Sequence, residues 1–145
     1  MTPPQSIRHS TTLRRLYLSS NHIRDLDDAT LNRITGLTSL SLQNNHLDKM
    51  PWHFPRPRQL LELDIWKNKF ETFPTVVTEL ESLRDLNIAF NMITEFPEEI
   101  GNMKTLETFS TVQNQYSKFP DGAAGMTSLR VLDYRQNVIA DLSVL

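Results

Sequence analysis

The chain has 145 residues, of which 39% are hydrophobic, and this supplies enough apolar side chain for one domain with a core. Its formal net charge is −2 at pH 7 and its pI is near 6.1. Because there is no basic surplus to neutralise phosphate groups, we expect neither nucleic acid nor an anionic membrane as a partner.

The first residues, MTPPQSIRHS, do not have the pattern of a targeting signal, since no basic segment is followed by an apolar one. No apolar run approaches the roughly 18 residues that cross a bilayer, so membrane insertion is not expected. The sequence contains neither cysteine nor an Asn-x-Ser/Thr triplet. Both absences favour a reducing compartment and predict a cytoplasmic location. We expect a mobile tail over residues 1–10 and one domain over residues 11–145.

From residue 13 onward, one pattern returns through the chain in six copies. The first copy, LRRLYLSSNHI (13–23), has alternating leucines, an asparagine and then an apolar residue. The others are LTSLSLQNNHL (37–47), LLELDIWKNKF (60–70), LRDLNIAFNMI (83–93), LETFSTVQNQY (106–116) and LRVLDYRQNVI (129–139). Their asparagines are Asn21, Asn45, Asn68, Asn91, Asn114 and Asn137, with steps of 24, 23, 23, 23 and 23 residues.

Each copy predicts one short strand followed by a turn. Leu16 and Leu18 alternate with other residues, which is the period of a strand with one apolar side. The segment of about 12 to 16 residues between strands must return the chain so that the next strand is parallel. The asparagine amide has both donors and an acceptor. We therefore expect it to bind buried backbone groups of its own coil and of the next coil.

The return segments carry a proline at a fixed place. An apolar residue and a proline follow the asparagine by five and six positions, at Met50-Pro51, Phe73-Pro74, Phe96-Pro97 and Phe119-Pro120. This proline predicts the start of a short helix or 3₁₀ turn. The return PWHFPRPRQL is expected to be irregular because of Pro57. The first return, LDDATLNRITGL, lacks the proline and has a more helical pattern.

On these residues, the chain resembles the leucine-rich repeat family over residues 13–142, since the period lies within the family's range of about 20 to 29 residues. It is similar to the repeats of Ras-group leucine-rich repeat scaffolds and of the leucine-rich repeat region of fungal adenylyl cyclases. The expected fold is an α/β right-handed solenoid, with a curved parallel sheet on the concave face and short helical or 3₁₀ returns on the convex face. The resemblance implies a docking surface, often for small GTPases, that performs no chemistry.

The outward side of the predicted sheet contains the candidate partner site. Trp66 gains nothing from the core in an outward position, and Phe90 and Val112 are near it, so these residues predict an apolar contact centre. The complete set of candidate protein-binding residues is Glu62, Asp64, Trp66, Lys67, Asp85, Asn87, Phe90, Val112, Asp133 and Arg135. The alternatives are that Trp66 only lies on Lys67, that Phe90 turns inward and that the acidic residues only keep the face soluble.

The sequence predicts no catalytic residue, metal site or cofactor. His22 and His46 are expected to lie one above the other, but their column offers no third ligand, so two solvated histidines are the simpler interpretation. His53, beside Trp52, is assigned to packing. Gly-x-Ser-x-Gly, a glycine-rich phosphate loop and His-Glu-x-x-His are all absent.

Aromatic residues form a second column, which is assigned to the core. Phe73, Phe96 and Phe119 share the inward position of Leu26, Met50 and Leu142. The second inward strand position, filled by aliphatic residues in the first four copies, is Thr111 and then Tyr134 in the last two. We expect the small Thr111 to make room for Tyr134.

The ends of the sequence predict a piece of a longer solenoid, because it begins without an evident cap and stops at ADLSVL, part-way through a return. Self-association through the uncapped end coils is therefore expected. The expected function is protein binding through the concave face, with a small GTPase implied by the resemblance alone. One alternative is a spacer within a larger signalling enzyme such as an adenylyl cyclase. The other, a catalytic or metal-binding domain, has no supporting motif.

Overall fold

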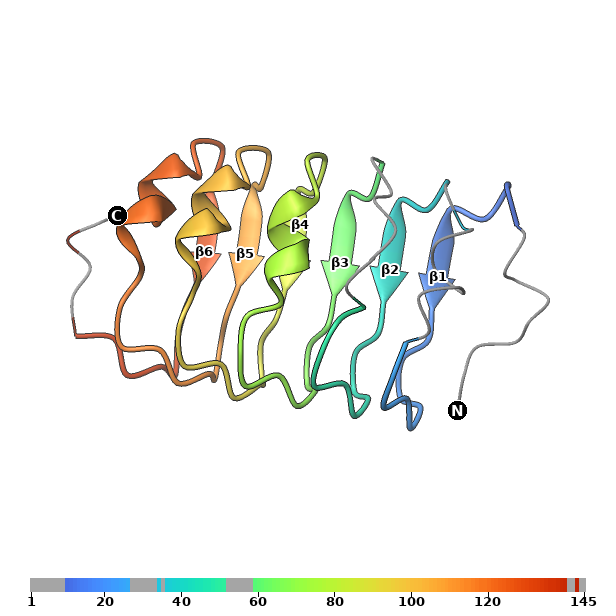
Figure 1. Cartoon of the computed structure of the whole chain (residues 1–145), viewed down its shortest axis with the longest axis horizontal. Coiled ribbons are helices and arrows are strands. Elements are labelled where there is room, and N and C mark those ends of the chain that lie inside the picture. Colours follow the sequence, from blue (N-terminus) through green and yellow to red (C-terminus); the bar gives the residue numbers. More distant parts are fainter. Residues whose placement is uncertain (1–9, 27–33, 35, 52–58, 141–142, 144–145) are drawn as a thin grey trace.

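Short strands lie side by side in chain order and form one parallel sheet (Figure 1). The computed structural model describes residues 10–26, 34, 36–51, 59–140 and 143. Within these ranges the sheet has six strands of three residues each, in the order β1-β2-β3-β4-β5-β6. They are β1 (Arg15–Tyr17), β2 (Ser39–Ser41), β3 (Glu62–Asp64), β4 (Asp85–Asn87), β5 (Thr108–Ser110) and β6 (Val131–Asp133). The predicted leucine-rich repeat solenoid with a curved parallel sheet is confirmed.

Several expectations concern parts of the chain outside the described residues. Of the expected mobile tail, residues 1–10, only Ser10 is described, and its hydroxyl accepts a hydrogen bond from the N–H of Leu13 at 3.1 Å. Residues 27–33 and 35 of the first return and residues 52–58 of the irregular return also lie outside the described ranges. Trp52, His53 and Leu142 belong to these parts as well.

The register between strands is in phase, so equivalent residues form continuous rows across the sheet. The central row, whose side chains point into the solenoid, is Leu16, Leu40, Leu63, Leu86, Phe109 and Leu132. All of these are buried except Leu132, which is half-buried. Because side chains alternate along a strand, the first and third residues of each strand face outward.

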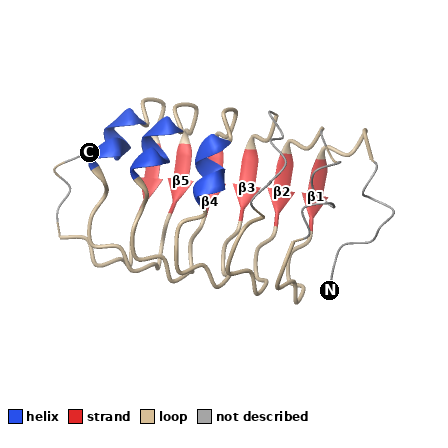
Figure 2. Cartoon of the chain, viewed as in Figure 1, coloured by secondary structure: helices blue, strands red, loops and turns tan. Residues whose placement is uncertain are grey.

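The returns after β3, β4 and β5 each contain a short 3₁₀ helix, drawn in blue in Figure 2 in front of the strands. These helices are η2 (Thr75–Glu79), η3 (Glu98–Asn102) and η4 (Asp121–Gly125). Each begins directly after a proline, and the φ angles of Pro74, Pro97 and Pro120 are −71°, −72° and −70°. The ring of proline fixes φ near this value, so the predicted helix starts are confirmed. Among the described residues, no helix has the length and apolar character to cross a bilayer.

The repeated asparagine joins neighbouring coils through its side-chain amide. Asn45 Nδ2 donates to the carbonyl oxygen of Leu42 in its own coil and to that of Leu18 in the preceding coil, both at 2.9 Å. Asn45 Oδ1 accepts from the backbone N–H of Ile23, also in the preceding coil, at 3.1 Å. The same three bonds are made by Asn68, Asn91 and Asn114.

The amide therefore hydrogen-bonds a neighbouring coil, as predicted. The prediction of which coil is wrong, because the amide binds the preceding coil and not the next one. The reason lies in the strand geometry. The N–H of Leu18 faces the following coil and donates to Ser41 O at 2.8 Å. The Leu18 carbonyl faces the same way, so it is the following coil's asparagine that meets it.

The phenylalanine column lies in the core, as predicted. Phe73, Phe96 and Phe119 are buried, together with Leu26 and Met50 of the same column. The Phe96 ring centroid is 5.6 Å from that of Phe73 and 5.1 Å from that of Phe119. The column of aromatic rings, edge-to-face between Phe73 and Phe96 and stacked between Phe96 and Phe119, thus connects three consecutive coils.

Thr111 has a buried polar neighbour in this core that the sequence did not indicate. Thr111 and Tyr116 are both fully buried. Among the described residues, the Tyr116 hydroxyl has no partner that satisfies the distance and angle of a hydrogen bond. Burial raises the pKa of Tyr116, and a weaker interaction with the Thr111 side chain partly opposes this increase. Tyr134 is half-buried with its ring 6.3 Å from that of Phe119. The Tyr116 hydroxyl is thus a neighbour of Thr111 that the sequence analysis did not anticipate. That Thr111 makes room for Tyr134 stays a prediction.

Candidate functional site

The outward face of the sheet ends in a row of residues with an unusual backbone conformation. The φ angles of Ser20, Asn44, Lys67, Phe90, Gln113 and Gln136 lie between 53° and 58°. Each of these residues directly precedes the repeated asparagine, where the chain leaves the strand and turns. For a side chain with a Cβ atom, the left-handed region costs roughly 1 to 2 kcal/mol, so a phenylalanine here is unfavourable for the backbone.

Trp66 and Phe90 form an aromatic pair on this face. Their ring centroids are 5.4 Å apart with an interplanar angle of 67°, an edge-to-face arrangement. Phe90 is 38% exposed and does not turn inward, so that alternative is wrong. Lys67 Nζ lies 5.7 Å from the Trp66 ring centroid, so the contact of Trp66 with Lys67 is also present. The two contacts of Trp66 coexist.

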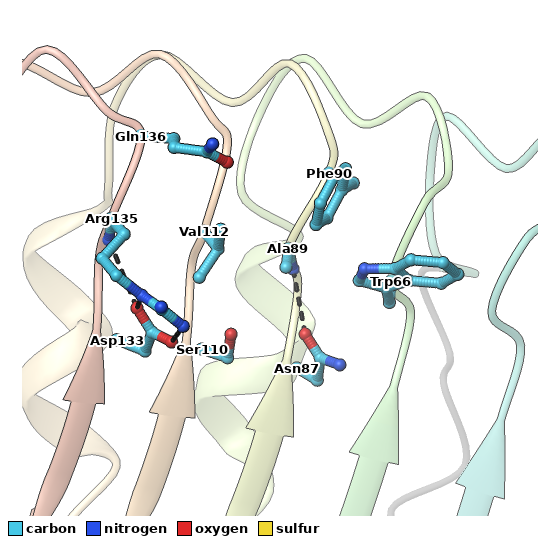
Figure 3. A pocket seen from close by; sticks show the side chains of 9 residues that line it. All are labelled: Trp66, Asn87, Ala89, Phe90, Ser110, Val112, Asp133, Arg135 and Gln136. Atoms are coloured by element: carbon cyan, nitrogen blue, oxygen red, sulfur yellow. Dashed lines mark hydrogen bonds and ion pairs between the residues drawn. The ribbon is translucent and has the colours of Figure 1, made fainter.

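The aromatic pair borders a hollow of about 400 Å³ over the ends of β3 to β6 (Figure 3). Six of the predicted residues line it, namely Trp66, Asn87, Phe90, Val112, Asp133 and Arg135. Three more lie on the same outward side but were not in the candidate set: Ala89, Ser110 and Gln136. Of these three, Ala89 explains why the hollow exists. It is a small residue between Trp66 and Val112 in one row, so it leaves a space that the larger side chains surround.

A second hollow of about 460 Å³ lies over β1 to β3 and is more polar. Of the predicted residues, Glu62 and Asp64 line it. The other lining residues, none of them in the candidate set, are Tyr17, Ser19, Ser39, Leu40, Ser41 and Gln43. Lys67 and Asp85 line neither hollow. The predicted set therefore spreads over two adjacent parts of the face.

Some of the predicted polar residues satisfy the backbone where the strands end. Asp64 Oδ1 accepts a hydrogen bond from the N–H of Trp66 at 3.0 Å. The equivalent bonds run from Ala89 N to Asn87 Oδ1 at 3.1 Å and from Arg135 N to Asp133 Oδ1 at 3.3 Å. A short acid or amide two residues before an N–H forms this local bond readily. These three residues thus have a structural role that the sequence analysis did not assign.

The charges on the face differ in their surroundings. Asp133 binds Arg135 through two side-chain bonds, at 2.6 Å and 2.9 Å, and these bonds hold the pKa of Asp133 below its usual value. Asp64 is partly buried, and burial raises its pKa, while its bond from Trp66 N opposes the shift. The Asp133–Arg135 pair is therefore neutralised internally.

The two histidines lie together, as predicted, at the exit of β1 and β2. The His22 and His46 rings are stacked with centroids 5.4 Å apart and an interplanar angle of 23°. Burial, followed by the positive charges of Lys69 and Arg24, lowers the pKa of His46. Within the described ranges, no group of three or more His, Cys, Asp or Glu side chains is placed to hold a metal ion.

The chain is similar to known repeat proteins in sequence. The family model described as "Leucine-rich repeat region" matches residues 3–143. Lumican of Rattus norvegicus is 41% identical over 68 residues, which are 46% of this chain and 20% of lumican. Podocan of Mus musculus is 36% identical over 64 residues, which are 43% of this chain and 10% of podocan. The chain thus spans about a fifth or less of the length of these relatives.

Solved structures show the same similarity in three dimensions. A leucine-rich repeat protein of Leptospira interrogans matches with a TM-score of 0.93 and 26% identity, over 99% of this chain and 36% of that protein. The ectodomain of the receptor kinase SOBIR1 from Arabidopsis thaliana matches with a TM-score of 0.70 and 27% identity, over 91% of this chain and 78% of the ectodomain. The complex PEPR1-AtPEP1 contains a chain that matches with a TM-score of 0.79 and 27% identity, over 94% and 20% respectively.

Proposed function

The chain belongs to the leucine-rich repeat family, and from this premise we propose that it binds a protein partner, without catalysis, through the concave face of its sheet. Six strands about 4.8 Å apart give a face roughly 25 to 30 Å wide. Such a face is large enough for an interface of about 800 Å² on each partner. Solenoids of stacked repeats commonly use their concave surface in this way.

The observation that carries this proposal is the aromatic pair of Trp66 and Phe90, which lines one hollow of the face together with Val112. Trp66 and Phe90 contribute large apolar side chains to a hollow instead of the core. Phe90 also occupies a left-handed backbone position that disfavours its side chain. The same conformation recurs in all six described coils, so it belongs to the repeat. What favours a partner contact is that a large aromatic side chain at this position is 38% exposed on the face instead of being buried in the core.

Affinity capture with matched variants tests the proposal. Wild-type chain, Trp66→Ala and Glu99→Ala are immobilised, and the captured proteins are quantified by mass spectrometry. Glu99 is exposed on η3, outside the sheet, and serves as the control. We expect at least one protein that binds the wild type and Glu99→Ala equally and is lost with Trp66→Ala. Equal capture by all three would favour the spacer hypothesis instead.

Three more specific hypotheses follow from the sequence: a small GTPase as the partner, a spacer role within an adenylyl cyclase, and a cytoplasmic location. A small GTPase as the partner is tested by titrating the chain with a purified small GTPase in its GTP-bound state, where absence of binding rejects it. A spacer role within an adenylyl cyclase predicts no captured protein that depends on Trp66. A cytoplasmic location is tested by fractionating cells that produce the whole protein.

Self-association is a further hypothesis of the same kind. Leu132 in β6 and Tyr134 after it are only half-buried, so apolar surface is available in the last described coil. Sedimentation velocity over a range of concentrations tests it. A single monomeric species at every concentration would reject the hypothesis.

A further inference from the structure

An acidic pair lies on the same face as the aromatic hollow. Glu62 in β3 and Asp85 in β4 are direct register partners, and both are exposed. Neighbouring strands are about 4.8 Å apart, so the two like charges oppose each other at a cost in stability. In the described part of the chain, neither side chain forms a hydrogen bond or an ion pair.

The cationic side chains of the face do not compensate this pair. Arg135 is bound by Asp133 through two short bonds. Lys67 holds its ammonium group over the Trp66 ring. Arg15 lies in β1, two strands from β3 and thus roughly 10 Å away across the sheet. Among the residues that the structure describes, Glu62 and Asp85 thus have no cationic partner, and their negative charge faces outward.

The distance between the acidic pair and the hollow determines how long a partner segment must be to contact both. Trp66 follows Glu62 by four residues along an extended chain, which is about 13 Å at the rise of a strand. An extended segment lying along β3 would cover this distance with four of its own residues. Positions i and i+4 of an extended segment face the same way, so both of those side chains would point at the sheet.

We propose that the partner presents an extended segment with a lysine or arginine and, four residues away, an aliphatic or aromatic side chain. The cation lies over Glu62 and Asp85. The apolar side chain enters the hollow between Trp66, Phe90 and Val112. This inference rests on the proposed function and adds to it the chemistry of the partner, a basic and apolar segment of a protein.

The polar middle of the face fits such a segment. Between the acidic pair and the aromatic pair lie Asp64 and Asn87, whose side chains already accept backbone hydrogen bonds. The side chain at position i+2 of the segment would face these two residues. We therefore expect a small or polar residue there, since a large apolar one would be placed against partly occupied polar groups.

A displayed library of random peptides tests the proposal with the folded chain as bait. Selected peptides are synthesised, and their affinities are measured for wild type, the double variant Glu62→Gln/Asp85→Asn, Trp66→Ala and the convex-side control Glu99→Gln. Thermal unfolding of every variant confirms that it is folded. The double variant keeps the side-chain shapes and removes only the charges.

We expect selected peptides to carry Lys or Arg four residues from an apolar residue. Their affinity should fall about tenfold or more for both the double variant and Trp66→Ala, and be unchanged for Glu99→Gln, with weaker binding at high salt. Peptides that depend on Trp66 but lack a cation and are insensitive to the double variant would overturn this inference and leave the proposed function standing. Failure to select any peptide that depends on Trp66 would count against both.

Discussion

Asn91 Oδ1 accepts a hydrogen bond from the backbone N–H of Phe70 in the preceding coil, at 3.2 Å. Its Nδ2 donates to Ile88 O in its own coil and to Ile65 O in the preceding one. Asn91→Ala would leave these buried backbone groups without partners, and we expect a loss of about 3 kcal/mol in the free energy of unfolding. Urea denaturation measures it.

Asn21→Ala is the matched control for that prediction. Asn21 is half-buried, and its described bonds reach only Leu18 and Ser19 of its own coil. The loss for this variant should be clearly smaller. Equal losses for the two variants would show that the coil-to-coil bonds do not contribute as inferred.

Phe96→Ala removes the ring at the centre of the aromatic column. Phe96 lies 4.1 Å from Tyr116 and 5.1 Å from Phe119 between ring centroids, so the variant leaves a cavity among packed rings. The free energy of unfolding should fall by about 3 to 5 kcal/mol. Met92→Ala, at an exposed site of the same coil, is the control and should cost far less. An unchanged denaturation midpoint for Phe96→Ala would contradict the assigned register.

Phe90 allows the backbone cost to be separated from the contribution of its ring. Phe90→Gly and Phe90→Ala both remove the aromatic contact with Trp66, but only glycine relieves the left-handed conformation at φ 56°. The glycine variant should therefore be about 1 kcal/mol more stable than the alanine variant. Both should lose any partner that depends on Trp66. An alanine variant as stable as the glycine variant would indicate that the backbone is not strained there.

Gly122→Ala tests the close contact between η3 and η4. A Cβ atom at Gly122 would lie 2.1 Å from the backbone oxygen of Glu98, so the two helices must separate. We expect a destabilisation of about 1 to 3 kcal/mol, measured by thermal unfolding.

Gly36→Ala is its control. There the added atom would meet the end of the Arg14 side chain, which is flexible and able to move aside. A nearly unchanged melting temperature is expected. A loss as large as that of Gly122→Ala would mean that the added methyl group, and not the backbone contact, is responsible.

His46 predicts a pH dependence of stability. Its pKa is lowered from the ordinary value of 6.5, first by burial and then by the charges of Lys69 and Arg24, so the unfolded chain binds the proton more readily than the folded one. The contribution of His46 to stability is complete above pH 6.5 and declines as the pH falls toward the lowered pKa. His46→Gln should reduce this acid-side decline in urea midpoints, and His22→Gln should reduce it less. Identical profiles for wild type and His46→Gln would refute the assignment.

The fold was predictable from the sequence because each position of the repeat occurs in six copies, so its preference for apolar or polar residues can be compared between copies. The alternation of Leu16 and Leu18, the asparagine spacing and the prolines before the 3₁₀ helices each act locally, and each was confirmed.

Properties that depend on neighbouring coils were less accessible. The direction of the asparagine bonds depends on which way the carbonyl of Leu18 points once the strands pair. The hollow beside Trp66 exists because Ala89 is small between larger neighbours, and that comparison requires the finished sheet. The partners of Thr111 likewise follow from the position of Tyr116 in the folded core.

Photocrosslinking from each side of the solenoid measures directly whether the concave face binds the partner. p-Benzoyl-phenylalanine replaces Val112 in the hollow or, in a second sample, Glu99 on η3, and the folded chain is irradiated with the protein captured in the affinity experiment. We expect a covalent adduct from position 112, whose yield falls when the selected peptides are added, and no adduct from position 99. An adduct from position 99 alone, or equal adducts that the peptides do not reduce, would contradict binding through the concave face.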